Sequence, residues 1–161
     1  LKDNGIELVD STTFLEPLLA RTGNLTKKTP TSDEHSDLSF GYGVADAIAR
    51  LDIGQTVVVK DRAVVAVEAM EGTDEVIARA ARIAGPGTTV IKVAKPGQDM
   101  RFDVPVVGVR TITELRKAGA AVLSVDAGRT LLLDGADVIE VANEAEIAVV
   151  GRALTSQDAR K

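Results

Sequence analysis

Cysteine and tryptophan are absent from the 161-residue sequence, and only one histidine, one tyrosine and three phenylalanines occur in it. Without cysteine the chain forms no disulfide, has no thiolate nucleophile and holds no cysteine-ligated zinc, and a single histidine excludes a histidine-rich metal site. The formal net charge of −5 and the shortage of aromatic side chains argue against a nucleic-acid surface, which needs a basic footprint and stacking platforms. We therefore expect no nucleic-acid partner.

Long apolar runs are missing as well. No run of about 18 apolar residues occurs, and the first residues show no basic segment followed by an apolar one, so we expect neither a membrane span nor an export signal. The sequence begins with Leu1 and not with methionine. We expect an upstream domain to precede Leu1.

Aliphatic residues must fill the interior, and they fall into short β-branched runs that alternate with stretches of helical spacing. Helices are predicted at 37–51, 74–84, 111–117 and 137–145, after a first helix that starts at Asp10 or Ser11. Strands are predicted at 6–9, 56–60, 63–69, 90–94, 104–109, 121–125, 130–133 and 147–150. Two hairpin-like pairs interrupt the right-handed crossovers, so the pattern predicts an α/β fold with a mixed β-sheet layered with helices.

The composition indicates three parts. Residues 1–36 are interpreted as the end of a preceding domain or a linker, 37–151 as a catalytic α/β domain and 152–161 as a flexible tail. The polar stretch 22–36 is typical of an exposed connector, and we expect its His35 to be solvated.

The stretch 91–103, IKVAKPGQDMRFD, places charges where a buried strand ends at Pro96-Gly97. Ligands bind at such strand exits in open α/β sheets. The cations could neutralise a diphosphate, and the carboxylates could hold Mg²⁺ or activate a water, which are the parts that phosphoryl-group hydrolysis needs. The alternative is a solvated loop with ordinary surface ion pairs. The residues concerned are Lys92, Lys95, Gln98, Asp99, Arg101 and Asp103.

A second cluster lies at 71–74, EGTD, where a strand leads through Gly72 and Thr73 into a helix. This arrangement points free backbone N–H groups at a phosphate. Glu71 and Asp74 would repel an anion unless a divalent cation lay between them, and Mg²⁺ accepts carboxylate and phosphate oxygens together. The simpler alternative is that the acidic residues favour the helix N-terminus through its dipole.

Three long segments resemble the LpxI-type UDP-2,3-diacylglucosamine pyrophosphatases: LDIGQTVVVKDRAVVAVEAMEGTDEVI (51–77), VIKVAKPGQDMRFDVPVVGVRTI (90–112) and AVLSVDAGRTLLLD (121–134). The resemblance extends to TGNLTKKTPT and FGYGVADAI nearer the start and covers nearly the whole chain. It concerns the C-terminal domain of that family and the approach to it, so it implies the C-terminal domain of a two-domain protein whose smaller N-terminal α/β domain is missing from this sequence.

The resemblance implies an activity. The expected reaction is hydrolysis of the diphosphate of UDP-2,3-diacylglucosamine to UMP and 2,3-diacylglucosamine 1-phosphate (lipid X), in lipid A biosynthesis of Gram-negative bacteria, with Mg²⁺ or another divalent cation. It further implies a cytoplasmic protein with transient contact to the inner-membrane surface, and leaves a homo-oligomer open. The rival hypotheses are a non-catalytic module that binds a nucleotide or a phospholipid precursor, and an oligomerising domain.

Residue roles follow from the residue types and the resemblance together. Asp103 is predicted to be the indispensable side chain. The expected catalytic residues are Asp103, Asp99, Lys95 and Arg101. The expected substrate-binding residues are Lys92, Gln98, Gln55, Thr73 and Gly72, with Asp52 further out. The candidate metal ligands are Asp103, Asp99, Glu71, Asp74 and Glu68.

Overall fold

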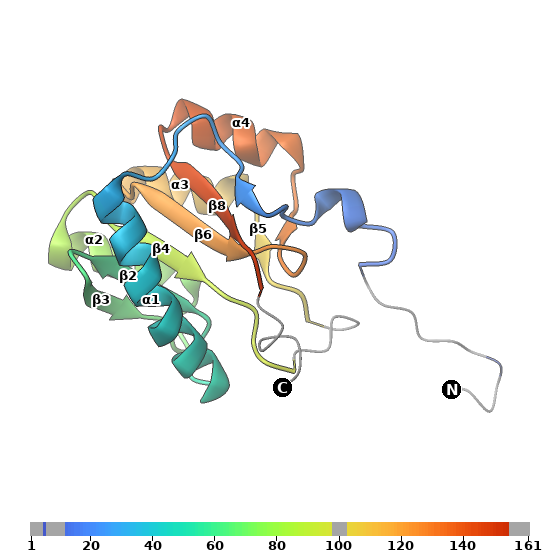
Figure 1. The fold of residues 1–161 in the computed structure, drawn as a ribbon, viewed down its shortest axis with the longest axis horizontal. Helices are drawn as coiled ribbons and strands as arrows, with labels where there is room; N and C mark the ends of the chain where they lie inside the picture. The colour runs from blue at the N-terminus through green and yellow to red at the C-terminus, as the bar shows by residue number, and fades with distance from the viewer. Residues whose placement is uncertain (1–4, 6–11, 98–102, 155–161) are drawn as a thin grey trace.

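The computed structural model describes residue 5 and residues 12–97 and 103–154. In this part of the chain a six-stranded mixed sheet, a two-stranded sheet and four α-helices are present (Figure 1). The large sheet has the order β1 (Gly23–Asn24), β8 (Ala148–Arg152), β6 (Val122–Asp126), β4 (Thr89–Lys92), β2 (Thr56–Lys60), β3 (Ala63–Val67). The small sheet pairs β5 (Val106–Val107) with β7 (Leu131–Leu132). The helices are α1 (Ser32–Arg50), α2 (Thr73–Ala84), α3 (Val109–Ala118) and α4 (Ala136–Glu144).

The four helices are divided between the two faces of the large sheet. The connections β3–α2–β4, β4–α3–β6 and β6–α4–β8 join parallel strands and all step the same way across the sheet. Because such crossovers are right-handed, α2, α3 and α4 cover one face. The helix α1 covers the other face, since its buried residues pack with Val57 and Ile91, whereas those of the other helices pack with Val58 and Val90.

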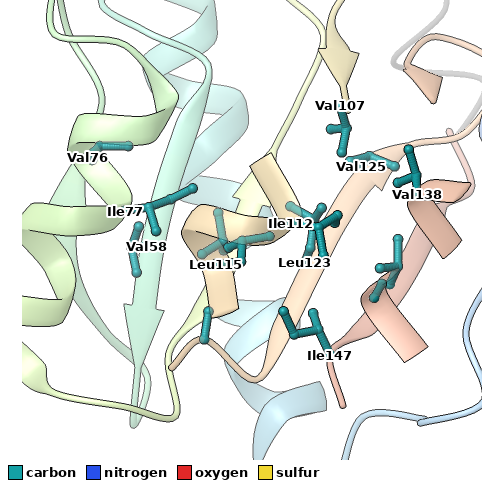
Figure 2. Close-up of a cluster of buried hydrophobic side chains, with 14 of the residues drawn as sticks. Val58, Val76, Ile77, Val107, Ile112, Leu115, Leu123, Val125, Val138 and Ile147 are labelled. Atoms are coloured by element: carbon teal, nitrogen blue, oxygen red, sulfur yellow. The ribbon is translucent and has the colours of Figure 1, made fainter. Parts of the chain in front are cut away.

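Two apolar clusters fill the space on either side of the sheet, because successive side chains of a strand point to opposite faces. Val58, Val90 and Leu123 face α2, α3 and α4 and belong to the larger cluster, part of which is drawn in Figure 2. Their neighbours Val57 and Ile91 face α1. The central strands are therefore apolar on both faces, which is why they read as continuous hydrophobic runs.

The mixed α/β fold is confirmed, but the connector predicted at 22–36 is shorter than expected. Its start forms the short edge strand β1, and its end is already the first turn of α1. Thr31 and Glu34 form a capping box, in which each side chain accepts the other's backbone N–H, and this box starts the helix at Ser32. His35 is exposed, as expected, although it lies on α1. The predicted domain boundary at 36–37 lies within this helix and stays a prediction.

The first predicted helix is wrong. Within the described residues around Phe14 and Leu19 the chain forms only a one-turn 3-10 helix, η2 (Glu16–Leu18). Pro17 provides no backbone N–H for a longer helix, and Leu19 instead bridges to Leu131 of β7. The strand predicted at 6–9 lies outside the described residues.

Candidate functional site

Four charged side chains lie at one end of the strands of the large sheet. The strands β3, β4, β6 and β8 run in the same direction, so this end is the carboxyl edge of the sheet. Glu68 follows β3, and Lys92, Asp126 and Arg152 are the last residues of β4, β6 and β8. In open α/β sheets the carboxyl edge is where ligands bind.

Lys92 and Glu68 are the two ends of a hydrogen-bonded chain through Thr73 on the α2 face of this edge, which we call the Lys92 cluster. Its Nζ donates to Thr73 Oγ1 at 2.8 Å, and Thr73 Oγ1 donates to Glu68 Oε1 at 3.0 Å. Lys92 is 7% exposed and Glu68 6%. A buried ammonium and a buried carboxylate are therefore joined through one hydroxyl group, which holds the end of β4 against the start of α2.

The electrostatics of Lys92 favour an anionic ligand. Burial lowers the pKa of Lys92, while the negative charges of Glu68, Asp74 and Asp103 act in the opposite direction. The ammonium has thus lost much of its hydration. A phosphate that reached it would replace the lost water and stabilise the charged form.

Glu68 is held by an unusually close approach of two backbone segments. A Cβ at Gly54 would collide with the Glu68 carbonyl oxygen, so only glycine fits there. The next residue, Gln55, donates its backbone N–H to Glu68 Oε2 at 3.3 Å, and its carbonyl accepts from Val93 N at 2.9 Å. The Gln55 side-chain Oε1 is buried, and no described residue hydrogen-bonds to it. An unsatisfied buried acceptor is costly, and this one lies in the segment next to the Lys92 cluster.

Two predicted metal ligands are engaged by arginines. Glu71 accepts from Arg79 Nη2 through Oε1 and from Ala69 N through Oε2. Hydrogen bonds from its own backbone N–H and from Arg79 lower the pKa of Glu71. Asp74 Oδ2 lies 3.0 Å from Arg110 Nε. Both oxygens of Glu71 therefore have protein partners, and Asp74 is partly neutralised.

Lys95 lies three residues beyond the end of β4. Its Nζ donates to Asp52 Oδ1 at 2.6 Å, and this hydrogen bond raises the pKa of Lys95, with further contributions from Asp103 and Glu68. Arg129 Nη2 donates to the Lys95 carbonyl oxygen at 3.2 Å. The segment that leaves β4 is thus held by Asp52, just after α1, and by Arg129, in the turn after β6.

The remaining predicted site residues are only partly placed. Gln98, Asp99 and Arg101 lie outside the described residues. Asp103 is exposed, and its negative charge acts to raise the pKa of both Lys92 and Lys95. Within residues 12–97 and 103–154, no group of three or more Asp, Glu or His side chains could hold a metal ion. Mg²⁺ usually needs only one or two carboxylates besides phosphate oxygens, and Asp103 fits that requirement.

Sequence reasoning missed a second polar network, which lies on the α1 face of the same edge. Asp126 Oδ2 accepts from Ala94 N at 2.8 Å, and its Oδ1 accepts from Arg152 Nε at 2.7 Å. Arg152 also forms a bidentate pair with Asp46 of α1, at 2.9 and 3.0 Å, and lies 4.9 Å from the Tyr42 ring centroid. Burial opposes the charge of Arg152, but its bonds to Asp46 and Asp126 raise its pKa.

This network positions the backbone beside the site. The Ala94 amide follows Lys92 by two residues, so Asp126 fixes the path of the chain as it leaves β4. Tyr42 completes the network through a 2.9 Å hydrogen bond between its hydroxyl and Ser124 Oγ, and burial raises the pKa of Tyr42. A carboxylate directly after the strand predicted at 121–125 was a sequence signal for Asp126 that the strand-exit rule could have used.

Comparison with known proteins adds an independent finding. The family model described as the LpxI C-terminal domain matches residues 21–150. The chain is 36% identical over 155 residues to the UDP-2,3-diacylglucosamine pyrophosphatase LpxI of Caulobacter vibrioides. The match covers 91% of this chain and 55% of that protein, so the chain spans about half the length of this curated relative.

Proposed function

The chain belongs to the LpxI family, as a C-terminal domain, and from this premise we propose that it takes part in hydrolysing the diphosphate of UDP-2,3-diacylglucosamine to UMP and 2,3-diacylglucosamine 1-phosphate. The observation that carries the proposal is the buried Lys92 ammonium at the carboxyl edge of the sheet, hydrogen-bonded to the first residue of α2. A desolvated cation beside a helix N-terminus stabilises developing phosphate charge.

The roles of the described residues follow from their contacts. Lys92 offsets negative charge on the diphosphate, and Thr73 and Glu68 hold its ammonium in place. Lys95 meets the substrate beyond the end of β4, where Asp52 keeps it protonated. Asp103 orients the attacking water, since it is an exposed carboxylate whose field reaches both lysines and a positioned carboxylate can act as a general base.

A divalent cation, Mg²⁺, belongs to the proposal. It would be held by Asp103 together with phosphate oxygens of the substrate, with Asp99 as the further ligand expected from the sequence. When bound, such an ion neutralises phosphate charge and polarises the phosphoryl oxygens. Glu71 does not support this role, because both of its oxygens are already hydrogen-bonded within the protein.

The cellular setting is also proposed. In the described residues no helix is long and apolar enough to cross a bilayer. We propose a cytoplasmic protein that meets the inner-membrane surface transiently through its lipid substrate, with the other half of the protein completing the cleft.

The decisive experiment measures UMP release from UDP-2,3-diacylglucosamine, with Mg²⁺, by the parent protein that includes the other half and by its Lys92→Met variant. Lys117→Met is the matched control, because Lys117 is an exposed lysine of α3 paired with Glu114. We expect turnover by the parent and the control and a loss of at least about 100-fold in Lys92→Met. UMP release by Lys92→Met at the parent rate would overturn the proposal. Substrate binding without any UMP release would support the rival binding module instead.

A further inference from the structure

Arg129 differs from the other half-buried arginines in the described part of the chain, which are Arg79 and Arg152. Arg79 is paired with Glu71, and Arg152 with two aspartates. The Arg129 guanidinium has no carboxylate partner among the described residues, and its hydrogen bond goes to the backbone carbonyl of Lys95. A partly desolvated cation without an anion is unfavourable, so a ligand that supplies negative charge would stabilise it.

The position of Arg129 places it across the end of β4 from the Lys92 cluster. Arg129 lies in the turn after β6, and β6 is the neighbour of β4 on the side away from β2 and β3. The ends of β4 and β6 lie side by side, because Lys92 is the register partner of Val125. Lys92 is held from the opposite side, by Thr73 and Glu68, which follow β3. The two cations therefore flank the end of β4.

The small sheet brings the same turn beside the Asp103 segment. Leu131 N donates to the Pro105 carbonyl oxygen at 2.9 Å, and β5 and β7 run parallel from there on. Asp103 precedes Pro105 by two residues, and Arg129 precedes Leu131 by two residues. With about 4.8 Å between neighbouring strands, their backbones lie within on the order of 10 Å of each other. Arg129 thus contacts the Lys95 backbone with its side chain and lies near Asp103 through its main chain.

The turn that carries Arg129 is firmly held. Arg129 N donates to the Asp126 carbonyl oxygen at 3.3 Å, and Gly128 N donates to the Ala20 carbonyl oxygen at 2.8 Å. Gly128 has φ +72°, in the left-handed region that glycine adopts readily. The start of the arginine side chain is therefore fixed before any ligand arrives, which lowers the entropy cost of binding.

We propose that Arg129 is a phosphate-binding residue, which contacts the diphosphate on the β6 side of the end of β4, opposite the Lys92 ammonium. The proposal rests on the proposed function, whose substrate carries the diphosphate. A guanidinium presents five N–H donors in a planar fork. With one donor on the Lys95 carbonyl oxygen, the others remain for two phosphate oxygens, the bidentate geometry that arginine favours. The contact couples the phosphate to the segment that carries Lys95.

The first test measures UMP release from UDP-2,3-diacylglucosamine, with Mg²⁺, by the parent protein that includes the other half, by Arg129→Met and by Arg82→Met. Arg82 is the control, because it is exposed in the last turn of α2. We expect Arg129→Met to lower kcat/KM about tenfold to 100-fold, the range for a lost hydrogen bond between charged groups. Arg82→Met should keep the parent value. An unchanged kcat/KM in Arg129→Met, or an equal loss in Arg82→Met, would overturn the proposal.

A second measurement separates phosphate binding from support of the Lys95 segment. The affinity for UDP is measured by isothermal titration in the parent, in Lys95→Met and in the double variant with Arg129→Met. If Arg129 acted only by holding Lys95, its replacement would cost nothing further once Lys95 is replaced. We expect a further loss of about tenfold, because the guanidinium itself contacts a phosphate. No further loss in the double variant would overturn the phosphate contact.

A conservative variant covers the case in which Arg129→Met does not fold. Arg129→Lys retains the positive charge but has no fork, so it cannot hold the Lys95 carbonyl oxygen and two phosphate oxygens together. We expect its kcat/KM to fall about tenfold at an unchanged unfolding temperature. The parent value of kcat/KM in Arg129→Lys would overturn the forked contact.

The titration also separates failure of this inference from failure of the proposed function. If the parent protein releases no UMP, the proposed hydrolysis fails, and Arg129 is judged by UDP affinity in buffer without Mg²⁺. Binding that is about tenfold weaker in Arg129→Met than in the parent and in Arg82→Met would support the phosphate contact. Equal affinities in the three proteins, or no binding of UDP by the parent, would exclude it.

Discussion

Lys92 Nζ donates a 2.8 Å hydrogen bond to Thr73 Oγ1, and this bond connects the last residue of β4 to the first residue of α2. Thr73 transmits the contact to the Glu68 carboxylate after β3. One threonine therefore sets the position of the cation on which the proposed chemistry depends.

Thr73→Val should lower kcat/KM by about tenfold to 100-fold, because a buried group that loses its hydrogen-bond partner costs about 1–3 kcal/mol. Valine has the shape of threonine but offers Lys92 no acceptor and Glu68 no donor. Thr73→Ser retains the hydroxyl and should keep most of the activity. Steady-state UMP release measures both, and equal activity of the valine and serine variants would contradict the role of the hydroxyl.

The alkaline limb of the pH–rate profile should reflect the deprotonation of Lys92. The proposed role needs the ammonium form, which is lost as the pH rises through the pKa of Lys92. Burial lowers that pKa below the ordinary 10.5, so log kcat/KM should begin to fall at a lower pH than an exposed lysine would give. In Lys92→Arg the side chain stays charged at every accessible pH, and the limb should vanish from whatever activity remains. An unchanged limb in that variant would assign it to another group.

Asp103→Ala should reduce turnover by about 100-fold or more, the range expected for a lost general base, and leave the fold intact. Asp103 is exposed, so its removal creates no cavity and thermal unfolding should be unchanged. Asp33→Ala is the control, since Asp33 is an exposed carboxylate in the first turn of α1. Near-parent hydrolysis by Asp103→Ala with Mg²⁺ present would refute the assignment.

Removal of the divalent cation tests the metal part of the proposal separately. Chelation with EDTA should abolish UMP release, and added Mg²⁺ should restore it, because the ion and the phosphate oxygens form one site. The thermal unfolding temperature without substrate should change little, since no described cluster of three acidic or histidine side chains could hold the ion alone. Full activity in EDTA would show that the lysines suffice.

The strand-exit rule pointed to this region of the fold, because the rule depends on local pattern. Lys92 lies within the strand expected at 90–94, which in the structure already ends at Lys92. Glu68 and Thr73 lie where another strand was expected to lead into a helix. Their contact depends on topology, since β3 and β4 are parallel with β2 between them. The order of the strands in the sheet cannot be inferred from local patterns in a single sequence.

Several residues have partners that are distant in the sequence or on another element. Glu71 was predicted to bind metal, but Arg79, two turns into α2, occupies one of its oxygens. Arg152 was assigned to the tail because the sequence around it is polar, whereas β8 extends through it along β6. Its pairing with Asp46 spans 106 positions, and no local periodicity reveals such a pair.

Asp126 should contribute both to the stability of the fold and to the position of the chain that follows β4. Asp126 is 1% exposed and holds both Arg152 and the Ala94 N–H. Asp126→Ala should lower the free energy of unfolding by about 3 kcal/mol. This is the smallest loss expected when a buried ion pair is broken, because Arg152 keeps Asp46 as a partner. Asp126→Asn can still accept from Ala94 N and should retain more activity than the alanine variant at equal folded fraction. Urea unfolding and kcat measured on the same samples test this. If the two variants lose activity only in proportion to their unfolded fraction, Asp126 stabilises the fold and does not position the residues that follow β4.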